Sequence, residues 1–359
     1  MERDGSMTTT KNDAQNHHAT FNDIPEQAAR WLNEGHKVAL ATVVQTWGSS
    51  PRPVGSQLAV NESGALVGSV SGGCIEGAVV TEALDIMESG RPSLLEFGVD
   101  DSMAWEVGLA CGGTVKVYVE ALNADDRQIL DNLLEKRRTT KPATLVTDVT
   151  SGQQCLISND EKSGPLDPPA EITAFCADVL RQDKSRLVEL GDQQFFLQAH
   201  NPPLRLFIIG AVHISQALAP IASLAGYEVN LVDPRQAWAT EERFPAIHID
   251  KRWPDDALEG QSLNSRTAVV TLTHDPKLDD PALEKALRSD VFYIGALGSK
   301  KTHAKRVARL QDAGFTEDEI NRIDAPVGLD IGAVSPAEIA VAIMGQITLS
   351  LRGPKHANG

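Results

Sequence analysis

The pattern of hydrophobic and polar positions changes character near residue 204. Upstream, short segments rich in β-branched residues, such as KVALATVVQT (37–46), alternate with loops that contain glycine and proline, which predicts strands joined by turns. Downstream, continuous apolar runs such as LRLFIIG (204–210) alternate with helical segments. Because such runs are typical of strands buried on both faces, this half predicts a parallel sheet covered by helices.

These patterns indicate an α/β chain with two domains. We expect an N-terminal mixed α+β domain, including a linker, over residues 23–200, and a C-terminal Rossmann-like doubly wound parallel sheet over residues 204–352. Residues 1–22 are predicted to be a disordered tail and residues 353–359 a short tail. No internal repeat is evident at the spacing of solenoid proteins.

Cap signals place several helix ends. Asp23 with Glu26, and Ser335 with Glu338, have the spacing of a capping box, and the helix that follows the first glycine pair is expected to end at Gly90. Residues 122–200 carry a weaker pattern. There we expect a helix at 125–137, strands at 143–149 and 193–200, and a loop over 158–171.

Composition narrows the range of partners. The 359 residues carry a net charge of −16, whereas nucleic acids and anionic membranes select basic surfaces, so neither is expected as the main partner. No apolar run reaches membrane-spanning length, and the first 23 residues lack the hydrophobic segment of a secretory signal. The four cysteines show no CxxC spacing, which favours a cytoplasmic protein with reduced thiols.

The first strand of the C-terminal half ends in a turn typical of nucleotide-binding folds. Gly210 ends this strand and Asp233 ends the next, a spacing that suits an acid on a ribose hydroxyl with phosphate at the helix N-terminus. Val212 stands where a second glycine would allow pyrophosphate to approach the backbone. A strand–helix–strand unit that packs without binding a dinucleotide is therefore the alternative, and NAD(P) is not expected.

Three further stretches follow predicted strands. Gly298 and Ser299 open a helix that bears Lys300, Lys301, Lys305 and Arg306, which predicts either a phosphate site or a solvated basic face. Asp330, in a glycine-bearing loop, could bind a ligand or satisfy local backbone donors. His274 and Asp275 follow another strand, and an ordinary turn is favoured there over a metal or acid–base site.

Two of the cysteines lie beside glycine pairs. Cys74 follows Gly72 and Gly73 and opens a helix, a position that stabilises a thiolate, although Glu76 opposes this effect. Cys111 precedes Gly112 and Gly113, which leave its sulfur unshielded. Each thiol is as well suited to contact a ligand or metal as to be a small buried hydrophobe, whereas Cys155 and Cys176 are expected to be buried.

Several long motifs resemble the XdhC/CoxI family of molybdenum-hydroxylase maturation factors. In the N-terminal half they are ATVVQTWGSSPRPVGSQLAV, GSVSGGCIEGAV and GLACGGTVKVYVE. In the C-terminal half they are YEVNLVDPR, FYIGALGSKKTHAKRVARL and PVGLDIGAVSPAEIAVAI. The resemblance runs from about residue 42 to residue 351, in the family's order.

This resemblance implies a chaperone rather than an enzyme. Such proteins bind the molybdenum cofactor, support its sulfuration by a cysteine desulfurase, and deliver it to the large subunit of an apo-hydroxylase of the xanthine or CO dehydrogenase type. A dinucleotide form of the cofactor would add a nucleotidyltransferase to the partners, and a homodimer is compatible with the resemblance. The resemblance assigns cofactor binding to Cys111, as a ligand of molybdenum, with Cys74 second; molybdenum's affinity for thiolates suits this role.

Three positions depart from the family's pattern: Val212 within GAVH (210–213), Pro276 after THD (273–275), and Gln346 in the last helix. All three lie in the C-terminal half, which indicates a sub-branch with its own client or cofactor form. Two alternatives to the chaperone stay open. One is an NAD(P)-dependent oxidoreductase that uses the C-terminal sheet, and the other is a scaffold for a hydroxylase complex.

Overall fold

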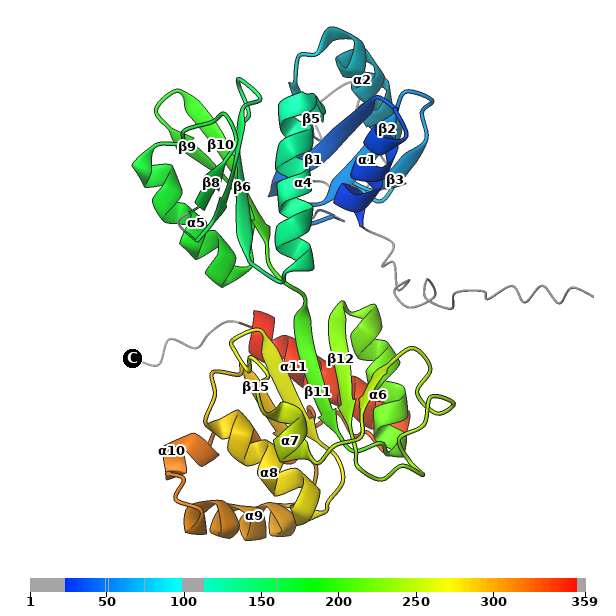
Figure 1. The fold of residues 1–359 in the computed structure, drawn as a ribbon, viewed down its shortest axis with the longest axis vertical. Coiled ribbons are helices and arrows are strands. Elements are labelled where there is room, and N and C mark those ends of the chain that lie inside the picture. The colour runs from blue at the N-terminus through cyan, green and yellow to red at the C-terminus, as the bar shows by residue number, and fades with distance from the viewer. Residues whose placement is uncertain are drawn as a thin grey trace, which may run out of the picture. The chain divides into compact units, whose positions relative to one another are not determined.

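The chain divides into two compact units, residues 1–202 and 203–359, in a computed structural model (Figure 1). The structure describes residues 23–48, 50, 52–73, 75–98, 113–159 and 161–353. The two predicted tails therefore lie outside the described residues, apart from Gly353. Each unit is described by itself below.

Unit 1 contains two five-stranded antiparallel sheets. Their strand orders are β3-β2-β1-β5-β4 and β8-β7-β6-β10-β9. The first sheet comprises β1 (Val38–Trp47), β2 (Gln57–Asn61), β3 (Leu66–Gly68), β4 (Ser93–Phe97) and β5 (Thr114–Ala121). The second comprises β6 (Ala143–Asp148), β7 (Gln154–Ser158), β8 (Glu161–Ser163), β9 (Arg186–Leu190) and β10 (Gln193–His200).

The two sheets are built to the same plan. Each is preceded by a helix, α1 (Ile24–Asn33) or α4 (Ala124–Arg138), and each has a second helix between its third and fourth strands, α2 (Glu76–Ser89) or α5 (Ala170–Gln182). The correspondence between the two sheets also holds for individual residue pairs. Thr42 pairs with Gln57 and Tyr118, and at the related positions Thr147 pairs with Gln154 and Phe196. Unit 1 is thus a tandem structural repeat.

A glycine at the same place in each repeat has the same steric cause. A Cβ on Gly68 would lie 2.3 Å from the carbonyl oxygen of Gln57, and a Cβ on Gly164 would lie 2.4 Å from that of Gln154. Both glycines have a positive φ, 100° and 130°. No side chain fits at these two crossings, so glycine is required at both.

The helices of unit 1 cover both faces of their sheets. Residues at alternate positions of β1 contact α1 on one side and α2 on the other, and α4 and α5 enclose the second sheet in the same way. This double coverage explains why KVALATVV is apolar throughout rather than alternating. Cys155 and Cys176 lie in the core of the second repeat, with 1% and 4% of their surfaces exposed, which confirms the expectation of buried thiols.

The predicted capping box at the start of α1 is wrong. Asp23 is the N-cap residue, but its side chain makes no capping hydrogen bond. Instead, Arg137 of α4 donates to Asp23 at 2.7 Å and to Glu26 at 2.8 Å. The two carboxylates therefore join the first helices of the two repeats, an ion pair between segments more than 100 residues apart.

Unit 2 contains a six-stranded sheet in which every strand pair is parallel. The strand order is β13-β12-β11-β14-β15-β16, which confirms the doubly wound Rossmann-like sheet. The strands are β11 (Leu204–Ile209), β12 (Tyr227–Val232), β13 (His248–Asp250), β14 (Thr267–Thr271), β15 (Tyr293–Ala296) and β16 (Ile323–Asp324). The chain reverses its direction of travel across the sheet between β11 and β14, where open α/β sheets bind ligands.

Helices pack on both faces of this sheet (Figure 1). One face is covered by α6 (His213–Leu224) and α11 (Pro336–Arg352), and the other by α7 (Pro254–Leu258), α8 (Pro276–Leu287), α9 (Lys300–Asp312) and α10 (Glu317–Ile320). The capping box of α11 is confirmed, because Ser335 accepts from the Glu338 amide and Glu338 accepts from the Ser335 amide.

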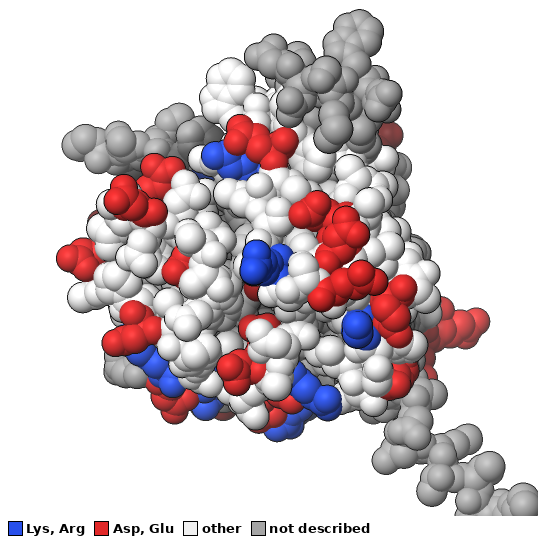
Figure 2. Space-filling model, turned by 90° about the horizontal axis from the view of Figure 1, so that it is seen from above, with Lys and Arg blue, Asp and Glu red and all other residues white. Residues whose placement is uncertain are grey.

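Several elements were absent from the sequence-based prediction. These are β7, α5 and β9 in unit 1 and β13, α7, α10 and β16 in unit 2; in addition, β8 lies in the segment predicted as a loop. No helix in the described parts of the chain is long and apolar enough to cross a membrane. On the face drawn in Figure 2, acidic side chains are widespread, and the basic ones among the described residues do not merge into a continuous patch.

Candidate functional site

The turn after β11 is shaped by close packing against β14. Gly210 has φ 110°, and a Cβ there would lie 2.4 Å from Cγ2 of Thr273. Ser215 donates to the Gly210 carbonyl oxygen at 2.5 Å, which fixes the turn to the first residues of α6. Val212 is the N-cap residue and is extended, with φ −97° and ψ 176°. The turn therefore has the expected strand-to-helix geometry with a β-branched residue at its N-cap.

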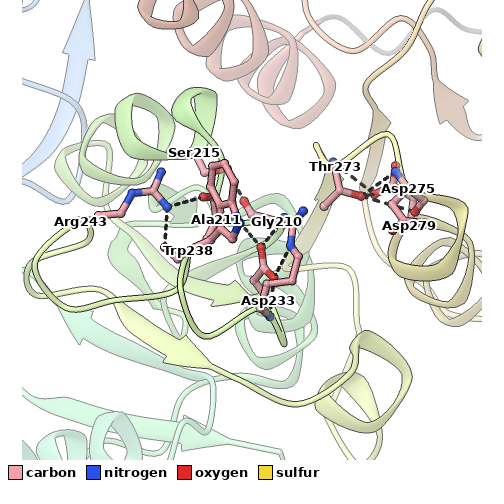
Figure 3. A network of polar contacts seen from close by, with 10 residues as sticks. Gly210, Ala211, Ser215, Asp233, Trp238, Arg243, Thr273, Asp275 and Asp279 are labelled. Atoms are coloured by element: carbon pink, nitrogen blue, oxygen red, sulfur yellow. Dashed lines mark hydrogen bonds and ion pairs between the residues drawn. The ribbon is translucent and has the colours of Figure 1, made fainter.

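The Asp233 carboxylate accepts hydrogen bonds from the protein itself (Figure 3). Its side chain is fully buried, and its carboxylate accepts from the Ala211 amide at 2.7 Å and the Arg235 amide at 2.9 Å. The Arg235 guanidinium adds two further hydrogen bonds, at 2.9 and 2.6 Å. In this structure the acid expected to bind ribose holds the Gly210 turn and Arg235 instead.

The electrostatics of Asp233 fit this role. Burial alone would raise the pKa of Asp233, but the hydrogen bonds from Arg235 and from the Ala211 amide more than offset burial and hold the pKa below its usual value. The carboxylate is therefore charged at neutral pH.

Beside this turn, the exposed indole of Trp238 lies close to the guanidinium groups of Arg235 and Arg243; Figure 3 labels Trp238 and Arg243. The Trp238 side chain is 45% exposed, and the Cζ atoms of Arg235 and Arg243 lie 5.7 and 5.3 Å from its ring centre. Arg243 is fixed by donating to the carbonyl oxygens of Ala211, at 2.9 Å, and Trp238, at 2.6 Å. An aromatic face flanked by fixed cations can stack a flat ring and attract its anionic groups. Sequence reasoning missed Trp238, although the tryptophan five residues after Asp233 was a usable signal.

The loop after β14 has the structure of a capped turn. Asp275 is the N-cap of α8 and accepts from the Lys277 amide at 3.0 Å, while His274 is exposed with φ 61°. Thr273 donates to Asp279 at 2.7 Å, so the loop is closed onto the first turn of the helix. This geometry agrees with the ordinary turn favoured from the sequence.

The start of α9 brings Gly298, Ser299 and Lys300 to the carboxyl end of β15. Gly298 is buried with φ 144°, and Ser299 caps the helix by accepting from the Thr302 amide at 3.2 Å. Lys300 is exposed. Asp330, in the loop before α11, is also exposed. All four residues lie in unit 2, but Asp330 shares no described contact with the other three.

Gln346 stands where the resembled family commonly has an acid, and it has a structural role here. Its Oε1 accepts from the Tyr293 hydroxyl at 2.7 Å and from the Gly328 amide at 2.6 Å, and its Nε2 donates to Asp324 at 3.3 Å. The amide thus joins β15, β16 and the loop before α11.

In unit 1, Glu76 organises the loop that leads to Cys74. Its two oxygens accept six hydrogen bonds: from the hydroxyls of Ser69 and Ser71 at 2.7 and 2.5 Å, and from the amides of Val70, Ser71, Gly72 and Gly73 at 2.9 to 3.2 Å. Burial opposes ionisation, but these hydrogen bonds prevail and lower the pKa of Glu76 to about 2. The loop is therefore wrapped around a carboxylate that stays ionised.

The two glycine-flanked thiols cannot be placed. Cys74, Cys111 and Gly112 lie outside the described residues, and Gly113 comes immediately before β5. Among the residues that the structure describes, no group of three or more His, Cys, Asp or Glu side chains could hold a metal ion. The assignment of Cys111 to molybdenum stays a prediction.

Comparison with known proteins decides the family. A model of the XdhC and CoxI family matches residues 31–98, and a model of the XdhC Rossmann domain matches residues 206–347. The chain belongs to the XdhC/CoxI family. This confirms the resemblance drawn from the motifs.

Individual relatives match most of the chain. The molybdenum cofactor insertion chaperone PaoD of Escherichia coli (strain K12) is 28% identical over 89% of this chain and 85% of its own length. A protein of Bacillus subtilis (strain 168), described as a probable xanthine dehydrogenase subunit, is 27% identical over 88% of this chain and 94% of its own. A solved structure described as a xanthine dehydrogenase from Bacillus halodurans superposes with a TM-score of 0.74, at 26% identity, over 93% of this chain and 97% of that one.

Proposed function

We propose that this member of the XdhC/CoxI family binds the molybdenum cofactor as cargo and inserts it into an apo molybdenum hydroxylase of the xanthine or CO dehydrogenase type. The observation that carries the proposal is the similarity to a molybdenum cofactor insertion chaperone across both units, over 89% of this chain. We further propose that the protein supports sulfuration of the cofactor, with a cysteine desulfurase as partner. A nucleotidyltransferase would join the partners if the cofactor is a dinucleotide.

Cys111 is the residue to which we assign the metal end of the cofactor, with Cys74 as the second choice. A thiolate is a soft ligand that suits molybdenum, and adjacent glycine amides can donate to an anionic group. The described part of the loop before Cys74 supports a role near the ligand, because Glu76 fixes Gly72 and Gly73 with positive φ values of 82° and 120°. These hydrogen bonds hold residues 69–73, which precede Cys74, in a defined conformation.

We assign the flat ring system of the cofactor, or its nucleotide, to Trp238. Its half-exposed face and the guanidinium groups of Arg235 and Arg243 suit a heterocycle that carries phosphate. NAD(P)-dependent oxidation is disfavoured, because the Asp233 carboxylate is buried and accepts four hydrogen bonds from the protein, which leaves it poorly placed for a ribose hydroxyl.

The decisive measurement is the molybdenum and pterin content of protein purified without oxygen from cells that make the cofactor. We expect near-stoichiometric molybdenum and pterin in the wild type, and their loss in Cys111→Ser. Cys155→Ala is the matched control, since it removes a buried thiol from the same unit. Retention by Cys111→Ser with loss in Cys74→Ser would move the metal ligand to Cys74. No pterin in the wild type would refute the proposal and favour the scaffold.

The ring assignment has its own paired test. Trp238→Ala should weaken binding of the isolated cofactor by at least tenfold, as expected for loss of one aromatic stacking partner. Trp253→Ala is the control, because that indole is similarly exposed, at 49%, but belongs to the N-cap residue of α7, where its side chain makes no capping hydrogen bond. Equal effects of the two substitutions would remove Trp238 from the site.

A further inference from the structure

A polar cavity in unit 2 lies between α8 and α9. Its volume is about 220 Å³. Its basic lining comes from His274, Lys301, Lys305, Arg306 and Arg309, and its acidic lining from Asp279 and Asp280. Neither Trp238 nor Asp233 lines it, so it is separate from the surface assigned above to the ring of the cofactor.

The cations of this cavity exceed its available anions. Arg309 and Asp280 neutralise one another through two hydrogen bonds, at 2.5 and 2.9 Å. Lys301 and Lys305 are exposed, one helical turn apart, and neither forms an ion pair with any other described residue. The N-terminus of α9, whose helix dipole favours anions, adds to their positive potential.

Arg306 supplies an independent observation. Its side chain is 2% exposed, and its Nη2 donates to the Leu297 carbonyl oxygen at 2.9 Å. Its Nε and Nη1 have no hydrogen-bond partner within the described part of the chain, and the nearest carboxylate, Asp279, lies 3.8 Å from Nη2. A buried guanidinium with unsatisfied donors is costly, and an oxyanion in the cavity that it lines would relieve this cost.

We propose that this cavity binds the phosphate group of a small ligand. Arg306 would provide donors from the floor of the cavity, and Lys301 and Lys305 would provide charge at its rim. The two negative charges of a phosphate dianion balance the positive charges of Lys301 and Lys305, whereas the single charge of a carboxylate does not. The phosphate could belong to a nucleotide or to a phosphorylated pterin, and the proposal concerns the chemistry that both share. It does not rest on the proposed function, since it concerns the protein without cofactor.

Equilibrium dialysis of the intact, cofactor-free chain against labelled inorganic phosphate tests this proposal, at constant ionic strength. We expect one phosphate per chain, and at least tenfold weaker binding by Lys301→Gln/Lys305→Gln. Both lysines are exposed, so the variant should fold. Lys184→Gln/Lys251→Gln is the matched control, because it removes the same charge from exposed positions outside the cavity and should change affinity less than twofold.

The remaining outcomes are also informative. Competition by a nucleoside monophosphate or by a phosphorylated pterin identifies the source of the phosphate. Absence of phosphate binding, equal losses in the two double variants, or competition by acetate as strong as by sulfate would each overturn the proposal. The pair of Arg306 and Asp279 would then be a packing feature alone.

Discussion

Replacing Glu76 by glutamine tests whether one carboxylate builds the loop that leads to Cys74. From the described residues, the Glu76 oxygens accept six hydrogen bonds, whose donors belong to the segment 69–73. Glutamine keeps one acceptor oxygen but places an NH₂ group where Oε2 accepts from Ser71 and Gly73. The Ser71 hydroxyl can turn to accept from this group, but the Gly73 amide then faces a donor. Because Gly73 is exposed, we expect a cost at the lower end of the about 1–3 kcal/mol of an unsatisfied donor.

The lowered pKa of Glu76 gives an independent value for the free energy that its carboxylate contributes to folding. A carboxyl group with a pKa of about 2 in the folded protein and 4.5 in the unfolded chain contributes at most about 3 kcal/mol of stability. Glu76 is partly open to solvent, so screening reduces this to about 1–2 kcal/mol. Because folding lowers the pKa, this stabilisation is complete above pH 4.5 and is lost as the pH falls toward 2.

The assay combines urea unfolding with amide hydrogen exchange of residues 70–73. We expect Glu76→Gln to lower the free energy of unfolding of unit 1 by about 2 kcal/mol at pH 7, with faster exchange in the loop, and the difference from wild type to shrink between pH 4.5 and pH 2. Glu88→Gln, at an exposed position near the end of the same helix, is the control. A difference that stayed constant over this pH range would refute the electrostatic reasoning.

Two further substitutions test steric and electrostatic features of the fold. Gly210→Ala should destabilise unit 2 by about 2–4 kcal/mol in urea unfolding, since it adds a clash with Thr273 to an unfavourable positive φ, whereas Gly226→Ala, at φ 88° with open space around its Cβ, should cost only about 1 kcal/mol. Burial raises the pKa of Glu120 to about 8, so the contribution of this group to the stability of unit 1 is complete only below about pH 4.5, the pKa in the unfolded chain, and is lost progressively as the pH rises from there through 8. Glu120→Gln should remove that loss in unfolding measurements between pH 6 and pH 9, and an unchanged pH profile would contradict the assignment.

Unit 2 was predictable from the sequence because its strands are buried on both faces. LRLFIIG is a continuous apolar run and YEVNLVD and TAVVTLTHD are mainly apolar; helical segments separate them, and only one sheet type accommodates that order. The missed strands of this unit, β13 and β16, have three and two residues, and their pairing with longer strands rather than their own composition makes them strands.

The repeat in unit 1 could not be seen from the sequence. The related residues are few, namely a threonine, a glutamine and a glycine in each half, and their separations differ from pair to pair. Thr42 and Thr147 are 105 positions apart, whereas Gln57 and Gln154 are 97 apart. The failed capping box has a similar cause, because Arg137, the partner of Asp23 and Glu26, comes from the other repeat.

Two of the acids chosen from the sequence as ligand contacts, Glu76 and Asp233, share one structural role. Glu76 follows a glycine pair and accepts the amides of that pair, and Asp233 accepts the Ala211 amide of the glycine turn beside it. A short motif that combines glycines with an acid therefore indicates a loop that needs an internal acceptor as readily as it indicates a bound ligand. On the proposed function, the groups that meet the ligand are those that such loops lead to. For the Asp233 turn we expect this to be the indole of Trp238 with its two arginines, and for the Glu76 loop the adjoining Cys74. The paired tests on Trp238 and on the two thiols bear directly on this division between residues that hold a loop and residues that contact the cargo.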